Sequence, residues 1–210
     1  MTVPAVPGPE VLARDIVQGL AAGRFAPGQR LAEPDLMARY GVGRSTVREA
    51  LGRLAAAGLV DQVPHRGAAI RRLTRREAGD VLRVAAVLLA LAARQAAEAV
   101  ALGADPAPLL QAVAGLDDPG RGRARYYRAL TQLAGNAELM RLMPAMQVPL
   151  LRAQLAGHLP DGAADHAAMV AAVADGRAEA AAARAAAYLA RLLAVLETVP
   201  EAAFAPAPPG

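Results

Sequence analysis

The chain has 210 residues, of which 55% are hydrophobic and only 3% aromatic, and its formal net charge is +4. This length allows one large domain or two small ones, and an aliphatic, alanine-rich composition favours packed helices over a sheet. Cysteine is absent, which excludes disulfides, thiolate nucleophiles and cysteine-ligated metal centres.

The charge is unevenly distributed along the chain. Residues 9–76 contain twelve arginines against six acidic residues, whereas the remainder contains eleven arginines against thirteen. A basic front half and a slightly acidic back half are typical of a nucleic-acid-binding module joined to a second domain. The most apolar run, residues 84–93, is too short to cross a bilayer, and no signal peptide is recognisable. We therefore expect a cytoplasmic protein with no membrane partner.

Both ends of the chain are rich in proline, and we expect residues 1–8 and 200–210 to be disordered. Apolar residues recur at every fourth position over residues 9–22, which predicts a first helix. Residues 24–31 contain a Pro-Gly pair and are expected to form a connecting turn.

The following segment predicts two helices separated by a tight turn. The second helix is expected to begin near Pro34, since proline's missing N–H would be unpaired at a first helical position, and to end at Gly41. The third is expected over residues 45–57, with a capping box between Thr46 and Glu49 at its start. Its apolar residues lie on one side and its polar residues on the other.

Two short strands, residues 59–63 and 68–71, are expected to form a hairpin after the third helix. Two helices, a turn and a hairpin are the layout of a winged helix-turn-helix, whose second helix enters the DNA major groove. In this chain the helix that would enter the groove is the third one, expected over residues 45–57. Arg44 and Arg48 lie one turn apart at its start, where each can reach a phosphate or a guanine edge. The other candidate DNA contacts are small or polar residues at the same helix end and at the hairpin tip, namely Gly43, Ser45, Thr46, His65, Arg66 and Gly67. Alone, the helix also fits a surface helix with solvated charges, but the whole layout favours DNA binding.

From residue 74 onward the pattern is helical without a fixed-length repeat, which predicts a helical bundle. Its helices are expected over residues 75–102, 107–115, 123–134, 137–156, 163–174 and 177–198. The fold class is therefore mainly α, with a winged helix-turn-helix domain over residues 9–73 and an all-α domain for dimerisation and effector binding over residues 74–199.

Residues 9–72 resemble the N-terminal domain of the GntR family of bacterial transcription regulators. The resemblance rests on residues 27–31 (PGQRL), 42–51 (VGRSTVREAL), 53–54 (RL), 58–60 (GLV) and 66–68 (RGA). One departure is Pro34, which stands where the family usually carries an arginine that contacts DNA, so that contact is lost here. The helical remainder resembles the family's FadR-like branch, whose FCD-type bundle binds small carboxylic acids, often beside a metal ion, and forms dimers.

The resemblance also implies where a metal site would lie. In the family an Asp, a His four residues later and two further histidines hold the metal, and the matching positions here are Arg123, Tyr127, His166 and Tyr188. Only His166 is a ligand, arginine cannot replace one, and the chain has three histidines in all, of which His65 belongs to the hairpin. We therefore expect no metal and no cofactor.

Arg123, Tyr127, His166 and Tyr188 remain candidates for a metal-free effector site, in which the guanidinium would bind a carboxylate directly. The alternative is that Arg123 points to solvent and that the tyrosines are core residues with paired hydroxyls. The family tends to place an Arg and a Glu in this cavity from the first helix of the bundle. Ala85 and Leu89 take those positions here, which favours an apolar ligand or none.

The sequence thus predicts a homodimeric transcriptional regulator, a repressor, that binds a near-palindromic double-stranded DNA operator. Its effector would be a small carboxylic acid or an apolar metabolite. An enzyme is not expected, because the chain has no glycine-rich phosphate loop, no nucleophile motif and no outstanding pair of carboxylates. A regulator whose bundle serves only as a dimerisation surface, with no effector, remains open.

Overall fold

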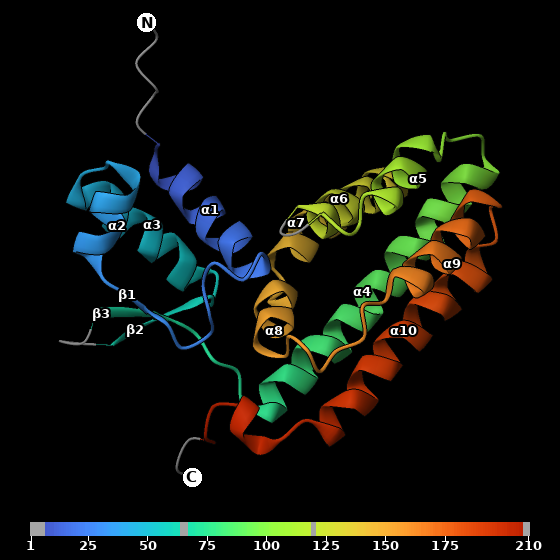
Figure 1. Cartoon of the computed structure of the whole chain (residues 1–210). Helices are drawn as coiled ribbons and strands as arrows, with labels where there is room; N and C mark the ends of the chain where they lie inside the picture. The colour runs from blue at the N-terminus through green and yellow to red at the C-terminus, as the bar shows by residue number, and fades with distance from the viewer. Residues whose placement is uncertain (1–6, 64–66, 119–120, 208–210) are drawn as a thin grey trace, which may run out of the picture. The chain divides into compact units, whose positions relative to one another are not determined.

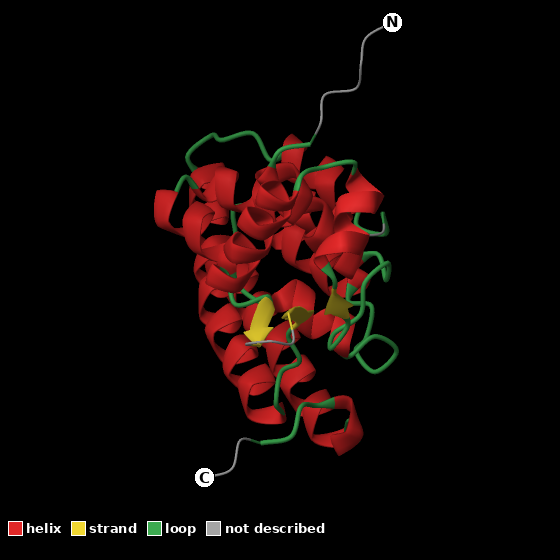
Figure 2. Cartoon of the chain, turned by 90° about the vertical axis from the view of Figure 1, so that its left-hand side faces the viewer, coloured by secondary structure: helices red, strands yellow, loops and turns green. Residues whose placement is uncertain are grey.

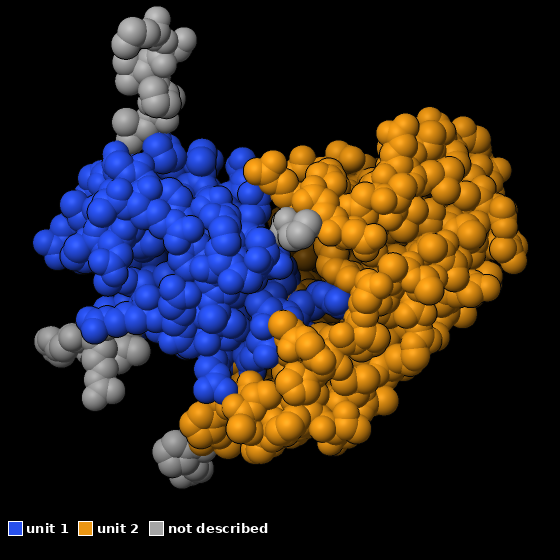
Figure 3. All heavy atoms as spheres, viewed as in Figure 1, with its two compact units in different colours: residues 1–72, 149–154 blue, residues 73–148, 155–210 orange. Residues whose placement is uncertain are grey.

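The computed structural model describes residues 7–63, 67–118 and 121–207 (Figure 1). The chain divides into two compact units, coloured separately in Figure 3. Unit 1 comprises residues 1–72 and 149–154, and unit 2 comprises residues 73–148 and 155–210. Residues 1–8 were expected to be disordered. Of these, residues 1–6 lie outside the described residues.

Most of unit 1 is built from three helices and a small antiparallel sheet. The helices are α1 (Pro9–Ala21), α2 (Glu33–Tyr40) and α3 (Arg44–Ala56). The strands are β1 (Arg30–Leu31), β2 (Val60–Val63) and β3 (Gly67–Ile70), in the order β1-β3-β2. Strand β1 corrects the sequence prediction, which gave residues 24–31 as a turn throughout; two residues are too short a run for an alternating pattern to show.

The recognition helix α3 is positioned by an aliphatic core. Its buried side consists of Val47, Ala50, Leu51 and Leu54, which are all at most 4% exposed. α3 packs against α1 and α2, and α1 contributes Leu12, Ile16 and Leu20 to the same core. Gly41 ends α2 in the left-handed region (φ 63°), where a side chain would be strained, and so makes the tight turn into α3.

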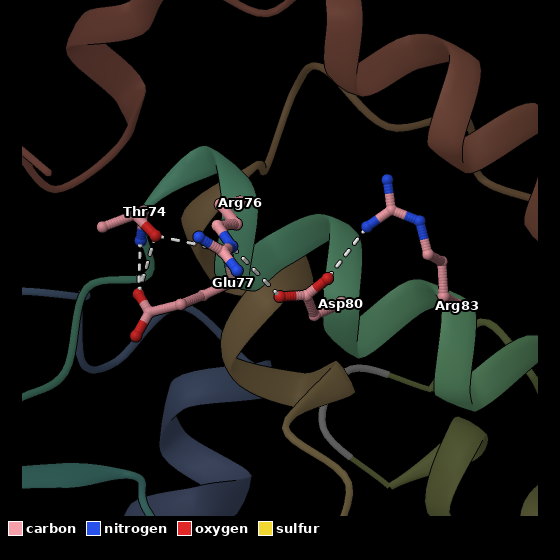
Figure 4. A network of polar contacts seen from close by, with 5 residues as sticks. All are labelled: Thr74, Arg76, Glu77, Asp80 and Arg83. Atoms are coloured by element: carbon pink, nitrogen blue, oxygen red, sulfur yellow. Dashed lines mark hydrogen bonds and ion pairs between the residues drawn. The ribbon is translucent and has the colours of Figure 1, made fainter.

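The capping box predicted at the start of α3 is wrong. The helix begins at Arg44 with Gly43 as its N-cap and no side-chain cap, so Thr46 is already the third helical residue. Glu49 instead accepts a hydrogen bond from Arg53, one turn further along, at 3.0 Å. A capping box does open α4 (Arg75–Ala101), where Thr74 and Glu77 satisfy each other's backbone N–H groups (Figure 4).

Unit 2 is helical in its described residues apart from connecting loops (Figure 2). The long helix α4 (Arg75–Ala101) packs along α10 (Ala178–Thr198) and also contacts α6 (Gly122–Ala134) and α9 (Ala163–Ala174). The shorter α5 (Ala107–Ala114) packs on α6 and α9. Alanines fill the inner face of α4, so the helices can approach closely without aromatic packing; these are Ala85, Ala92, Ala93, Ala96 and Ala97.

The single helix predicted over residues 137–156 is broken into three. The pieces are α7 (Ala137–Leu142), the 3-10 turn η1 (Met143–Ala145) and α8 (Val148–Gln154). The backbone leaves helical geometry at Met146 (φ −67°, ψ 137°). Pro144 and Pro149 on either side favour this break, since proline lacks the backbone donor of a continuous helix. Residues 149–154 of α8 belong to unit 1.

The C-terminal segment is not disordered throughout, contrary to expectation. A 3-10 turn, η2 (Glu201–Ala203), is followed by Phe204, which is only 3% exposed. Arg75 of α4 lies over the Phe204 ring at 4.5 Å, and the Ala205 N–H donates to the Leu73 carbonyl at 3.0 Å. The buried ring and the backbone bond together hold this proline-rich stretch. Residues 208–210 lie outside the described residues.

By length and composition alone, α4 is long and apolar enough to cross a membrane. The sequence analysis considered only residues 84–93, a run that is too short for this. A core helix of a protein with no membrane segment passes the same test. One such helix is weak evidence for a membrane span, and one side of α4 packs on α6, α9 and α10.

Candidate nucleic-acid interface and a buried histidine cluster

The polar side of α3 is open to solvent. The side chains of Arg44 and Arg48 are 72% and 69% exposed, while Val47 between them is fully buried. Ser45 is exposed and Thr46 half-buried at the same helix end. The free N–H groups of a helix start, two arginines and two hydroxyls form a surface suited to phosphates and base edges.

A carboxylate from α2 lies between the two arginines. Glu33 Oε2 accepts a hydrogen bond from Arg44 Nε at 2.8 Å, and Glu33 Oε1 lies 3.7 Å from Arg48 Nε. The sequence analysis did not single out Glu33. Its position beside the recognition helix depends on how α2 packs against α3, which no local pattern in the sequence indicates.

These residues line a hollow of about 520 Å³ on unit 1. Its walls come from β1, the start of α2, α3 and the two strands of the hairpin. The lining residues are Arg30, Leu31, Ala32, Glu33, Pro34, Arg44, Arg48, Leu51, Gln62, Gly67 and Ala68. Three arginines and one glutamate therefore share one concave surface.

Of the predicted DNA contacts, the structure brings Arg44, Arg48 and Gly67 to this hollow. Gly43, at φ −75°, is the N-cap of α3 and precedes Arg44 directly. Gly67 has φ 83°, so the hairpin needs a glycine there. The predicted contacts His65 and Arg66 lie outside the described residues.

A second polar group surrounds Asp15 of α1, behind the recognition helix. Asp15 accepts hydrogen bonds from Arg24 at 2.9 Å and from the Tyr40 hydroxyl at 2.7 Å. The bond from Arg24 lowers the pKa of the Asp15 carboxyl. Burial and the bond to Asp15 raise the pKa of Tyr40 to about 12. This network joins α1 to the end of α2 and thereby supports the helix-turn-helix.

In unit 2 a histidine is fully buried among aromatic rings. His166 of α9 is 0% exposed, and it packs edge-on against two tyrosine rings. Its ring centroid lies 4.9 Å from that of Tyr126 and 4.7 Å from that of Tyr188. Its Nδ1 lies 2.6 Å from the Gly162 carbonyl oxygen, which can only accept, so Nδ1 carries the proton. Its Nε2 then accepts a hydrogen bond from the Tyr127 hydroxyl at 3.3 Å.

Arg123 reaches the loop that precedes α9. Its Nη2 donates to the Asp161 carbonyl oxygen, while its Nη1 is buried and has no partner among the described residues. Its side chain is 26% exposed, so it neither points freely to solvent nor lies wholly inside. The positive charge of Arg123 opposes the pKa rise that burial causes at Tyr126.

The four predicted effector residues thus converge around one loop, residues 161–162, and Tyr126 joins them. Tyr126 is 0% exposed and was missed, although its spacing to Leu130, four residues on and also 0% exposed, marks the buried face of α6. Within the described ranges, no three His, Cys, Asp or Glu side chains come together as a metal site.

A winged helix with exposed arginines on its recognition helix, followed by a helical unit, defines a DNA-binding transcriptional regulator. Residues 10–70 match the family described as bacterial regulatory proteins, gntR family. The DNA-binding domain of this chain is accordingly a domain of the gntR family.

Relatives agree with this assignment. The chain is 27% identical over 166 residues to a probable D-xylose utilization operon transcriptional repressor of Paenarthrobacter nicotinovorans, covering 74% of each chain. A protein of Rhodococcus sp. RHA1 described as a putative transcriptional regulator GntR has a similar fold, with a TM-score of 0.74 and 23% identity, covering 90% of this chain and 97% of the other. E. coli McbR/YncC gives a TM-score of 0.75 at 18% identity with the same coverage. The family consists of regulators rather than enzymes, in line with the sequence analysis.

Proposed function

We propose that this chain is a repressor that binds a near-palindromic operator as a homodimer and releases it when a small metabolite binds unit 2. Two copies of α3 would enter successive major grooves, because a two-fold protein dimer matches a palindromic site. The observation that carries the proposal is the pair of exposed arginines, Arg44 and Arg48, one turn apart at the start of α3.

The DNA contacts in this proposal are Gly43, Arg44, Ser45, Thr46, Arg48 and Gly67, together with His65 and Arg66. Repression is supported by the name of the Paenarthrobacter relative, a probable repressor of a D-xylose utilization operon. Occupation of a promoter is also the simplest consequence of tight operator binding. The proposed DNA partner supports a location in the cytoplasm.

The effector would bind beside His166, between Arg123, Tyr127 and Tyr188. The buried, unpartnered nitrogen of Arg123 supports a carboxylic acid, because a carboxylate would supply the missing acceptor. Ligand binding would lower DNA affinity if the two states of the regulator bind the ligand unequally. We also propose that unit 2 is an FCD-type bundle and that it forms the dimer.

A second function is favoured by the tight packing of this cluster. His166, Tyr126 and Tyr188 are each at most 2% exposed, and both tyrosine rings contact the His166 ring, so the rings already occupy the centre. On this view unit 2 is only a dimerisation surface. A thermal-shift screen of small carboxylic acids, followed by operator release in a mobility-shift assay, separates the two functions.

DNA binding is tested by selecting bound duplexes from a random pool and measuring their affinity by fluorescence anisotropy at several salt concentrations. We expect log K to fall with log salt by about 0.9 per phosphate neutralised. Arg44→Ala and Arg48→Ala should each cost about 1–3 kcal/mol and broaden the selected sequence if the arginines read bases. A salt slope near zero would refute DNA binding by this chain.

A further inference from the structure

We propose that Arg30 of β1 is a phosphate anchor of the DNA interface, an assignment that rests on the proposed role of α3. The residue lies outside the helix-turn-helix and belongs to a strand of only two residues. No motif in the sequence marks it as a DNA contact. Three structural observations support the assignment: its place in the sheet, its lack of a partner, and the charges around it.

The register of the sheet brings Arg30 to the hairpin. Arg30 pairs with Ala69 of β3, so its side chain lies on the same face of the sheet as Ala69 and Gly67. A Cβ placed on Gly67 would meet Arg30 Nε as its nearest neighbour, at 4.0 Å. The guanidinium therefore extends along β3 from Ala69 towards Gly67, the first residue of that strand, and lines the same hollow as Arg44 and Arg48.

Other arginines of unit 1 are engaged in folding. Arg24 is bound to Asp15, Arg53 to Glu49 and Glu10, and Arg39 lies over the ring of Phe25 at 4.8 Å. Arg30 is exposed and has no hydrogen-bond or ion-pair partner within the described part of the chain. Its charge therefore contributes nothing evident to unit 1 and is available to a ligand.

The charges of the hollow favour a polyanion as that ligand. Arg30, Arg44 and Arg48 line this hollow with only one carboxylate, that of Glu33, so the surface keeps an excess of positive charge. Pro34 lines the same hollow and supplies no cation. Arg30 thus adds a cation to a surface where position 34 offers none, and an exposed guanidinium at the edge of a groove-binding helix fits the DNA backbone.

A phosphate contact carries no sequence information, and this property makes the assignment testable. The full chain and its Arg30→Ala variant are titrated into a duplex selected from a random pool and into a scrambled duplex of equal length. We expect Arg30→Ala to weaken both complexes by a similar factor and to reduce the salt slope by about 0.9 per protomer. Arg30→Lys, which keeps the charge, should retain the slope.

Arg14→Ala is the matched control. Arg14 on α1 is also exposed and unpartnered within the described residues, but it does not line the hollow, so its loss should leave both affinities unchanged. If Arg30→Ala behaves like Arg14→Ala while Arg44→Ala weakens binding, the role of Arg30 is refuted and the proposed function stands. Loss of binding to the selected duplex alone would also overturn the phosphate assignment. If Arg44→Ala has no effect either, the proposed function itself fails.

Discussion

Glu33 and Arg44 are joined across the turn of the helix-turn-helix by a hydrogen bond of 2.8 Å from the guanidinium to the carboxylate. The same carboxylate lies 3.7 Å from Arg48. DNA phosphates must therefore compete with Glu33 for the two arginines that are proposed to bind them. Glu33 is well placed to limit non-specific binding, because it weakens every phosphate contact irrespective of sequence.

Glu33→Gln is expected to raise the affinity for scrambled duplex DNA about fivefold, since two unit charges about 4 Å apart in water interact by about 1 kcal/mol. The ratio of specific to non-specific affinity should fall. Anisotropy titrations with selected and scrambled duplexes measure both quantities. Thermal stability should change little, because exposed ion pairs contribute at most about 1 kcal/mol.

Glu10→Gln is the control for this change. Glu10 is exposed and bound to Arg53, and it does not line the hollow, so its neutralisation should leave DNA affinity unaltered. A decrease in non-specific affinity on Glu33→Gln would contradict our interpretation. It would show that the carboxylate mainly holds Arg44 and Arg48 in a binding orientation.

Gly162→Ala should destabilise unit 2 and disturb the histidine cluster. Gly162 has φ 77°, and an added Cβ would lie 2.7 Å from the Tyr188 ring, which packs on His166. Gly157→Ala is a matched control, since its φ is 82° but nothing lies within 4 Å of the new Cβ. The positive φ should lower the free energy of unfolding of both variants by about 1–2 kcal/mol. The steric clash should lower that of Gly162→Ala by about 1–3 kcal/mol more. Equal losses in urea unfolding would show that the Tyr188 ring moves aside freely.

Tyr40 is expected to make stability depend on pH in the alkaline range. Its pKa is raised from 10.0 to about 12 in the folded chain, so its contribution is complete below pH 10 and is lost as the pH rises towards 12. Between these values the stability difference between the wild type and Tyr40→Phe should shrink. Urea unfolding of both proteins across that range measures the difference, and a constant difference would contradict the assignment.

Phe204→Ala should lower the free energy of unfolding of unit 2 by about 3 kcal/mol. This is the lower end of the range for a buried phenylalanine, which we expect because Phe204 lies near the chain end. The ring is 3% exposed and lies under the Arg75 guanidinium. Leu102→Ala, at a position that is 90% exposed, should have no comparable effect. Similar melting temperatures for the two variants would show that the C-terminal segment does not stabilise the bundle.

Much of the fold could be predicted from the sequence, because its helices have strong local signals. The periodicity of α1, the proline and glycine at the two ends of α2, and the apolar face of α3 each indicate an element within a few residues. The division of residues 137–156 into α7, η1 and α8 depends on two prolines that the apolar pattern concealed. The burial of Phe204 depends on contacts with distant residues, which a local pattern cannot reveal.

The candidate site was predictable only in part. Arg44 and Arg48 could be found because the spacing of one helical turn is visible in the sequence. Glu33 and Arg30 could not, since each comes to the hollow through packing between elements. In unit 2, Tyr127 was singled out because the resemblance matches it to a metal-ligand position, whereas Tyr126, the more deeply buried of the two adjacent rings, was not.

The backbone bond between Ala205 and Leu73 has a practical consequence for studying this regulator. Leu73 is the first residue of unit 2, so the described end of the chain is anchored beside the segment that links the two units. Ala207 is exposed, and the natural sequence has no cysteine to compete for a thiol-reactive dye. A fluorophore attached through Ala207→Cys would therefore lie near the segment at Leu73. Its emission would report changes around that segment when the operator binds and is released.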